Sequence, residues 1–251
     1  MLSSTASTFY TEMRLLMDRQ VREQTHAIST AAELIANSIS AGGMLHAFGS
    51  GHSEALAMEL AGRAGGLIPT NRVAFRDLIV FGGMPVAAVL DDKIERDPSI
   101  AQALYDLAEI GPHDVVVMAS NSGINGTVVE LATLIHEGGT PLIAITSRAH
   151  SSIEKSRHPS GRKLMDLADV VLDNGAPHGD ALVPLTEGGA VCGVSSITSA
   201  ALAQLIVAST VDLLREKAEP LPIYLSANIE GGDEHNSAWE ARYAGRLRRS
   251  A

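Results

Sequence analysis

The chain has 251 residues, 45% of them hydrophobic, and a formal net charge of −10. That length suits one large α/β domain or two small ones, and the acidic balance argues against a nucleic-acid-binding protein. Basic residues gather only near the C-terminus, where we expect a solvated helix end: Arg242, Arg246, Arg248 and Arg249. With one cysteine and no secretory signal pattern at the N-terminus, the chain is expected to be cytoplasmic.

A long helix is predicted over residues 7–40, because apolar side chains recur there at helical spacing. Its apolar surface is larger than one small domain covers, so we expect a homodimer or a homotetramer. We expect three parts in the chain: a helical extension (1–42), a central domain (43–217) and a C-terminal tail (218–251).

Beyond this helix, short apolar runs alternate with helical segments. The predicted strands are residues 44–48, 67–75, 85–90, 114–120, 141–147 and 168–173, and the predicted helices are 53–64, 99–110 and 126–137. Residues 148–167 are expected to form a loop with a short helix. This alternation predicts a three-layer α-β-α sandwich, of flavodoxin-like type, around a central parallel sheet of mainly five strands.

An uncharged run, residues 190–211, could be mistaken for a membrane span. It contains several serines and threonines and Gln204, and a lipid-facing helix would be poorer in such groups. The composition favours a helix buried between protein layers or subunits, and we expect no membrane partner.

The turn "FGSGHSEAL", residues 48–56, follows a predicted strand and precedes a predicted helix. It resembles the dinucleotide fingerprint G-x-G-x-x-G, but Glu54 stands where the third glycine belongs. A carboxylate there would face the pyrophosphate, so a dinucleotide site is excluded.

Three hydroxyl-rich turns follow predicted strands and are expected at one edge of the sheet: "GSGHS", "ASNSGINGT" and "TSRAHSS". Helix N-termini and glycine backbones at such turns bind anions, which indicates a phosphate with sugar hydroxyls rather than a metal. For any single loop, N-capping by Ser or Thr is the alternative. The predicted substrate and phosphate residues are Ser50, Gly51, His52, Ser53, Ser120, Asn121, Ser122, Gly123, Asn125 and Ser147.

With "GSGHS", "SNSGING" and "IAITS" in this order, the sequence resembles the SIS (sugar isomerase) domain over about residues 40–215. In that family the serines of the S-x-S-G element, here Ser120 to Gly123, hold the phosphate of a phosphosugar. The usual Thr two residues after the glycine is Asn125 here. The long N-terminal helix and the "GGDEHN" tail are similar to a phosphoheptose-isomerase-like subgroup.

The resemblance implies proton abstraction next to a sugar carbonyl, and Glu59 is the first candidate base. It lies about 9 Å along the predicted helix from Ser53, which suits a six-carbon sugar. A surface pair with Arg63, four residues on, is the alternative. Glu187 and His178 are the further catalytic candidates.

The polar group Asp233, His235 and Asn236 in the tail could enter a second subunit's site, as SIS sites commonly borrow residues from a neighbour. An ordinary helix N-terminus with an acidic first turn is the alternative for these tail residues.

Zinc is not expected. In phosphoheptose isomerases, which resemble this chain, a His stands on the first helix where this chain has Glu59. A Gln and a His stand eight residues apart on the C-terminal helix, where this chain has Gln204 and Asp212. Three suitable ligands are not visible together, so we predict no metal and no cofactor.

The zinc-free relatives include N-acetylmuramic acid 6-phosphate etherase, which works by β-elimination. The sequence therefore favours a lyase or dehydratase acting on an N-acetylhexosamine 6-phosphate such as N-acetylglucosamine 6-phosphate. An aldose–ketose phosphosugar isomerase and a non-catalytic phosphosugar sensor are the alternatives.

Overall fold

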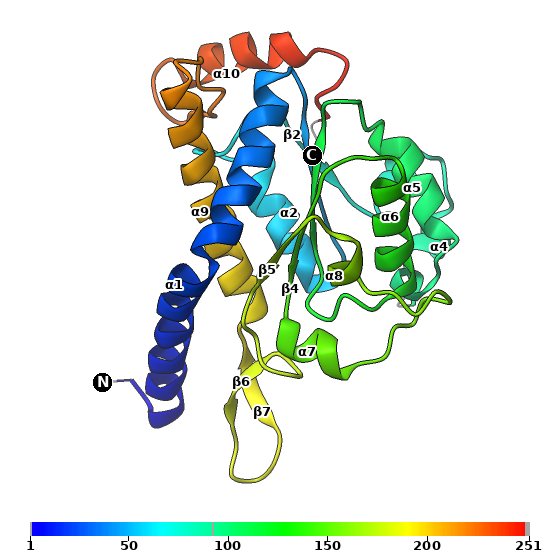
Figure 1. Ribbon diagram of the computed structural model, residues 1–251, viewed down its shortest axis with the longest axis vertical. Coiled ribbons are helices and arrows are strands. Elements are labelled where there is room, and N and C mark those ends of the chain that lie inside the picture. The colour runs from blue at the N-terminus through cyan, green and yellow to red at the C-terminus, as the bar shows by residue number, and fades with distance from the viewer. Residues whose placement is uncertain (1, 92, 249–251) are drawn as a thin grey trace.

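A five-stranded parallel sheet forms the centre of the protein, in the strand order β2-β1-β3-β4-β5. The computed structural model describes residues 2–91 and 93–248. The strands are β1 (Leu45–Gly49), β2 (Thr70–Val73), β3 (Val115–Ala119), β4 (Leu142–Thr146) and β5 (Val170–Asp173). The three central strands β1, β3 and β4 are rich in Val, Ile, Leu and Ala and are buried along their whole length, as a sheet between two helical layers requires (Figure 1).

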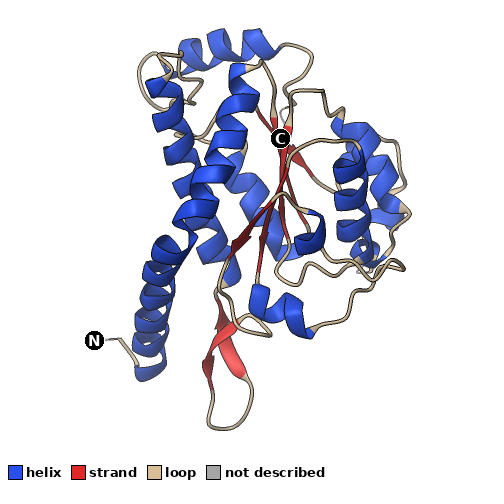
Figure 2. Cartoon of the chain, in the orientation of Figure 1, coloured by secondary structure: helices blue, strands red, loops and turns tan. Residues whose placement is uncertain are grey.

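Alternation along each strand divides the core in two. Leu45, Val117 and Ile143 face one layer, made of α1 (Ser4–Ser40), α2 (Glu54–Leu60) and α9 (Ser195–Glu216). The intervening strand residues face the other layer, whose helices are α3 (Asp77–Val80), α5 (Ile100–Ala108), α6 (Gly126–Glu137) and α8 (Leu164–Leu167). The predicted three-layer sandwich is confirmed, and the layers are visible on the two sides of the sheet in Figure 2.

The predicted long helix is confirmed as α1, which begins three residues earlier than expected. Its C-terminal half is buried against α9, whereas its N-terminal half extends past the body of the molecule (Figure 1). Tyr10, Leu15 and Val21 on that half are about half exposed. The three-part division of the chain stays a prediction.

The strand predicted at residues 85–90 is wrong. Residues Val86–Val89 form a single helical turn, α4, on the surface, with Pro85 before it. The fixed φ of proline suits the start of a helix, and residues Val86–Val89 pair with no strand in the described part of the chain.

The uncharged run at residues 190–211 forms two elements rather than one helix, since β7 (Ala190–Gly193) precedes α9.

The predicted loop at residues 148–167 contains two short helices, α7 (Arg148–Ile153) and α8. The sequence also gave no sign of an antiparallel hairpin, β6 (Ala181–Pro184) with β7, which projects from the body of the molecule (Figure 1). Short 3₁₀ helices lie at Gly51–Ser53 (η1), Ile94–Arg96 (η2) and Ala241–Tyr243 (η3).

Helix α9 is long and apolar enough to cross a membrane by length and composition alone. In this structure Leu202, Ala203, Ile206 and Val207 of α9 belong to the core beneath the sheet. The helix therefore has a packing role that explains its uncharged composition.

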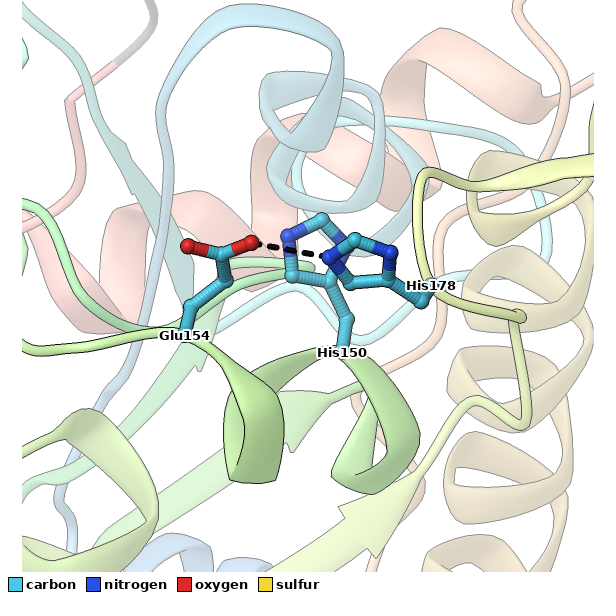
Figure 3. A group of neighbouring side chains, drawn as sticks. All are labelled: His150, Glu154 and His178. Atoms are coloured by element: carbon cyan, nitrogen blue, oxygen red, sulfur yellow. Dashed lines mark hydrogen bonds and ion pairs between the residues drawn. The ribbon is translucent and has the colours of Figure 1, made fainter. Parts of the chain in front are cut away.

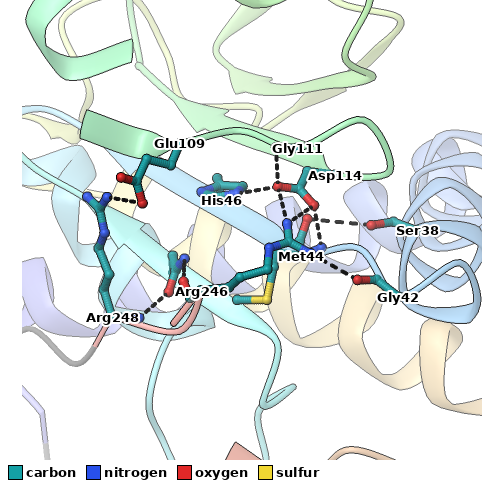
Figure 4. Close-up of polar contacts among 10 residues, drawn as sticks. Ser38, Gly42, Met44, His46, Glu109, Gly111, Asp114, Arg246 and Arg248 are labelled. Carbon is teal, nitrogen blue, oxygen red and sulfur yellow. Dashed lines mark hydrogen bonds and ion pairs between the residues drawn. The ribbon is translucent and has the colours of Figure 1, made fainter. Parts of the chain in front are cut away.

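The tail returns to the end of the sheet where the strands begin. It carries helix α10 (Gly232–Glu240), and Ile223 forms a bridge with Leu67, just before β2. Arg246 donates to both oxygens of Asp114, at 2.6 and 2.8 Å, and Asp114 directly precedes β3 (Figure 4).

The expected solvated basic helix end is therefore wrong for this region. Arg246 pairs with Asp114, Arg248 pairs with Glu109 at 2.8 Å, and Arg242 stacks on Trp239. Arg249 lies outside the described residues.

Candidate functional site

The loops that follow β1, β3 and β4 lie side by side, because these three strands are neighbours in the sheet. Parallel strands end at the same edge, which is where open α/β sheets bind ligands. The loops also bond to one another. The backbone N–H of Ser147 donates to the carbonyl of Asn121 at 3.0 Å, and the Ser147 hydroxyl donates to the Ala176 carbonyl at 2.6 Å.

The loop after β1 turns sharply between Gly49 and Ser53. Any side chain at position 49 would lie 2.1 Å from the Ser53 carbonyl oxygen, and Gly51 has a φ of +55°. Glycine is therefore required at both positions. Ser50 is buried in this turn, whereas His52 is exposed and its carbonyl accepts a weak bond from Ser196 at 3.5 Å.

The S-x-S-G loop after β3 is held in a turn by its own first serine. Ser120 accepts a hydrogen bond from the Gly123 N–H at 3.1 Å, and Gly123 has a φ of +66°. Asn125 precedes α6 without capping it through its side chain. The first amides of α6 therefore face the loop without a side-chain cap, the geometry in which a helix end holds an anion.

Glu95 is the residue that joins the first two loops, and it was not among the predicted site residues. Its carboxylate accepts from the Ser50 hydroxyl at 2.9 Å and from the Asn125 amide at 2.8 Å. Arg157 donates to the other side of Asn125, at 2.5 Å. Two predicted phosphate residues from different loops thus already hold one oxyanion.

The short helix η2 carries Glu95 to this position. The Thr127 hydroxyl lies 2.8 and 2.7 Å from the carbonyl oxygens of Ile94 and Asp97. A side chain at Gly126 would lie 2.3 Å from the Arg96 carbonyl oxygen, so only glycine lets the two segments meet. No motif in "KIERDP" signals this approach, because it depends on contacts made about thirty residues later in the chain.

Ser147 serves α7 rather than an open anion site. It caps that helix by accepting from the His150 N–H at 3.0 Å, as in the capping alternative for a single loop. Asn121, another predicted phosphate residue, accepts a hydrogen bond from the Asn174 side chain at 3.1 Å.

Glu59 lies on the inner side of α2, facing α9. Gln204 of α9 donates to its carboxylate at 2.6 Å, and Arg63 donates to the same oxygen. The expected pair with Arg63 is therefore present, together with a contact to α9. Asp212, by contrast, is exposed and pairs with Arg215 at 3.3 Å, so it does not join Glu59 and Gln204.

His178 belongs to a cluster with His150 and Glu154 beside the third loop (Figure 3). His178 Nε2 lies 2.8 Å from Glu154, and the two imidazole ring centres are 4.8 Å apart. Burial, with the neighbouring His178, lowers the pKa of His150. The hydrogen bond from His178 lowers the pKa of Glu154.

This cluster is the kind of donor set that could hold a metal ion, since its three ligand atoms lie within 4.8 Å of one another. Ligand atoms around tetrahedral zinc are about 3.4 Å apart, so the cluster would have to contract to hold one. The absence of a metal stays a prediction.

The structure places the other predicted site residues away from these loops. Glu187 lies at the exposed tip of the β6–β7 hairpin. His235 bonds to the Ile223 carbonyl at 2.9 Å, and Asn236 bonds to both the N–H and the carbonyl of Leu225 at 2.9 Å. His235 and Asn236 therefore stabilise the tail of their own chain. Asp233 lies on the first turn of the same helix, α10.

A family model described as "SIS domain" matches residues 8–147. The chain belongs to the SIS domain family. A UPF0309 protein of Listeria monocytogenes is 40% identical over 96% of this chain and 97% of its own length. A UPF0309 protein of Geobacillus kaustophilus is 37% identical over 88% of this chain and 86% of its own.

Solved structures share the fold of this SIS protein at low sequence identity. A phosphoheptose isomerase from Francisella tularensis is 14% identical with a TM-score of 0.57, and covers 83% of this chain and 98% of its own. A phosphoheptose isomerase from Neisseria gonorrhoeae is 20% identical with a TM-score of 0.52, over 84% and 97%. The predicted resemblance is confirmed at the level of family and fold.

Proposed function

We propose that this SIS protein is an enzyme that holds a sugar phosphate at the loops after β1 and β3. The observation that carries the proposal is the grip of Ser50 and Asn125 on a single carboxylate, that of Glu95. Donors that hold a carboxylate from two sides also suit a phosphate, which offers more acceptor oxygens and more charge. Asn125 directly precedes the first turn of α6, which has no side-chain cap, so the helix dipole adds to the attraction for an anion there.

The substrate phosphate takes the position of the Glu95 carboxylate in this proposal. Like charges repel strongly at hydrogen-bonding distance, so Glu95 and η2 shift when phosphate enters. Glu95 would then lie next to the bound sugar rather than on Ser50 and Asn125.

Glu59 is the proposed base. Gln204 and Arg63 hold its carboxylate in one orientation, which a proton-abstracting group requires. It takes the proton from the carbon next to the sugar carbonyl, and the electron pair of that C–H bond forms an enolate. A positioned base contributes about 10²–10⁴-fold to the rate.

The fate of the enolate defines the reaction. For a substrate with an N-acetyl group at C2, ordinary ketol isomerisation is blocked. The C3–O bond then breaks, the electron pair leaves with the hydroxyl, and an acid supplies the proton that completes water. We assign the acid to His178, which lies beside the third loop and is held by Glu154. The reaction proposed is thus a β-elimination on an N-acetylhexosamine 6-phosphate.

Exposed apolar residues on the projecting half of α1 support the proposal of a homo-oligomer. Between α1 and α9 lies a groove of about 350 Å³, lined by Met17, Val21, Ala201 and Leu205 among others. A second copy of the chain would bury this surface. A cytoplasmic location remains part of the proposal.

Incubation with hexose, heptose and N-acetylhexosamine 6-phosphates, followed by mass spectrometry, tests the reaction. Loss of water from an N-acetylhexosamine 6-phosphate is the expected result. An unchanged mass with a new retention time would instead establish an isomerase. Binding without turnover, measured by calorimetry, would establish a sensor.

Glu59→Gln is the variant that tests the base. Turnover should fall about 10²–10⁴-fold while phosphosugar affinity is kept. Glu33→Gln, on the exposed face of α1, is the matched control and should leave turnover unchanged. Full activity in Glu59→Gln would show that the pair with Arg63 and Gln204 is only structural.

A further inference from the structure

A cavity of about 800 Å³ lies along the outer edge of the sheet, beside β2. Strand β2 is an edge strand, and the end of α2 and the tail enclose the cavity beside it. Its polar lining includes Arg63, Thr70, Arg72, Arg76, Asp233 and Arg248. No residue of the loops after β1, β3 or β4 contributes to this lining.

Positive charge is concentrated in this cavity although the chain as a whole is acidic. Four of the 19 Lys and Arg residues line it. Carboxylates neutralise these arginines only in part. Arg72 lies 3.9 Å from Glu54, Arg63 pairs with Glu59, and Arg248 pairs with Glu109. Each of these contacts involves one nitrogen of a guanidinium that offers three.

Three of the residues that line this cavity each have a buried polar atom with no hydrogen-bond partner among the described residues. These atoms are Arg72 Nε, an Nη atom of Arg76 and the Thr70 hydroxyl. The Arg72 side chain is only 8% exposed. A buried donor without a partner costs free energy, so three such residues in the wall of one cavity indicate a ligand that accepts hydrogen bonds there.

We propose that this cavity is a second anion site, which binds a small phosphorylated polyol or sugar with its phosphate on Arg72, Arg76 and Thr70. The planar guanidinium fork matches phosphate oxygens, and the volume is that of an ordinary small-molecule site. Asp233 and the backbone around Ser226, at the tail side of the cavity, face the hydroxyl groups of the ligand.

This site also gives the tail a role within its own chain. Asn236 fixes Leu225 through both backbone groups, and Leu225 lines the cavity. The polar "GGDEHN" segment therefore shapes one wall of the site. The two sites have Arg63 in common, since it lines this cavity and also donates to Glu59. The inference does not depend on the proposed function, because its phosphate is held by Arg72, Arg76 and Thr70, none of which belongs to the first site.

Equilibrium dialysis with radiolabelled inorganic phosphate, at constant ionic strength, tests the second site. Two phosphates per chain are expected for the unaltered protein. Arg76→Gln and Arg72→Gln should each weaken one of the two by about tenfold or more, since each removes a charged donor. The combined Ser120→Ala and Asn125→Ala variant should lose the other phosphate and keep this one.

Arg215→Gln is the matched control, because Arg215 is exposed on α9 and should leave both phosphates in place. Circular dichroism spectra establish whether each variant is folded. If Arg72→Gln does not fold, Arg76→Gln alone tests the site. Two phosphates of unchanged affinity in the Arg76 variant would overturn the proposal. A change in oligomer size in that variant, with phosphate binding intact, would also overturn it and identify the cavity as an interface between copies. Absence of catalysis would affect only the proposed function.

Discussion

The two ends of the central sheet use polar side chains in opposite ways. At the end where the strands begin, Asp114 is fully buried and accepts from His46, Arg246 and the N–H groups of Met44 and Gly111 (Figure 4). At the end where the strands finish, Ser50 and Asn125 hold a partly buried carboxylate on a short surface helix. The first carboxylate is held by four donors in the core, whereas in the proposed function a substrate phosphate replaces the second.

The electrostatics of Asp114 show how strongly the first end is fixed. Burial alone would raise the pKa of this carboxyl, but the hydrogen bonds from His46, Arg246, Gly111 and Met44 outweigh burial and hold the pKa well below its usual range. Ionised Asp114 is thus part of the folded structure at neutral pH.

The largest effect on stability is expected for Asp114→Asn. This change removes the charge that four donors share, while Arg246 remains half-exposed and keeps part of its hydration. We expect a loss of about 2–4 kcal/mol in the free energy of unfolding, measured by urea denaturation. Asp212→Asn, which alters an exposed pair on α9, should change it by less than about 0.5 kcal/mol. If the two changes lowered the free energy of unfolding equally, the buried Asp114 would contribute no more to stability than an exposed ion pair.

The stability of the unaltered protein should fall in acid for the same reason. Because the folded pKa of Asp114 lies below its unfolded value of about 3.9, its contribution is complete above that value and declines as the pH falls further. The difference in melting temperature between the unaltered protein and Asp114→Asn should therefore narrow below about pH 4. A difference that stays constant down to pH 2 would contradict the proposed role of ionised Asp114.

A smaller effect is expected at the other end from Glu95→Gln. Loss of this charge removes the competitor for Ser50 and Asn125, so phosphosugar affinity should rise about three- to tenfold by calorimetry. Glu130→Gln, near the same loops but paired with His158, is the control and should leave affinity unchanged. Weaker binding in Glu95→Gln would mean that Glu95 positions the two donors rather than competing with the substrate.

The smallest effect is expected from removing metal ions. Dialysis against a chelator should change turnover by less than about twofold, because Glu59, Gln204 and the loops supply the proposed chemistry. If zinc restored activity lost on dialysis, and His150→Ala abolished that restoration, the His150, Glu154 and His178 cluster would be a metal centre.

Regular elements were predictable wherever one segment carried its own signal. Apolar runs such as "DVVVMAS" gave the central strands, and the Gly and Ser turns gave the loops at the correct end of the sheet. The prediction of a strand at residues 85–90 was wrong because a short apolar run has the same pattern in a buried strand and in a helical turn.

Residues whose partners are distant in sequence were not predictable. Glu95 acts through Ser50, 45 positions away, and the arginine cavity joins β2 to the tail. The "GGDEHN" motif of the tail was a candidate for the functional site, but its position in the fold was not predicted. That position depends on the contact of Arg246 with Asp114 and on the bridge between Leu67 and Ile223. Such contacts depend on the three-dimensional path of the chain rather than on local spacing.

The pair of Asp114 with Arg246 also has a consequence for synthesis on the ribosome. The two residues are 132 positions apart, so at about 5–20 residues per second Asp114 is made roughly 7–26 s before its guanidinium partner. Throughout that interval its carboxylate has only His46 and two backbone N–H groups to offset burial. The contact that completes this end of the sheet therefore forms only when nearly the whole chain has been made.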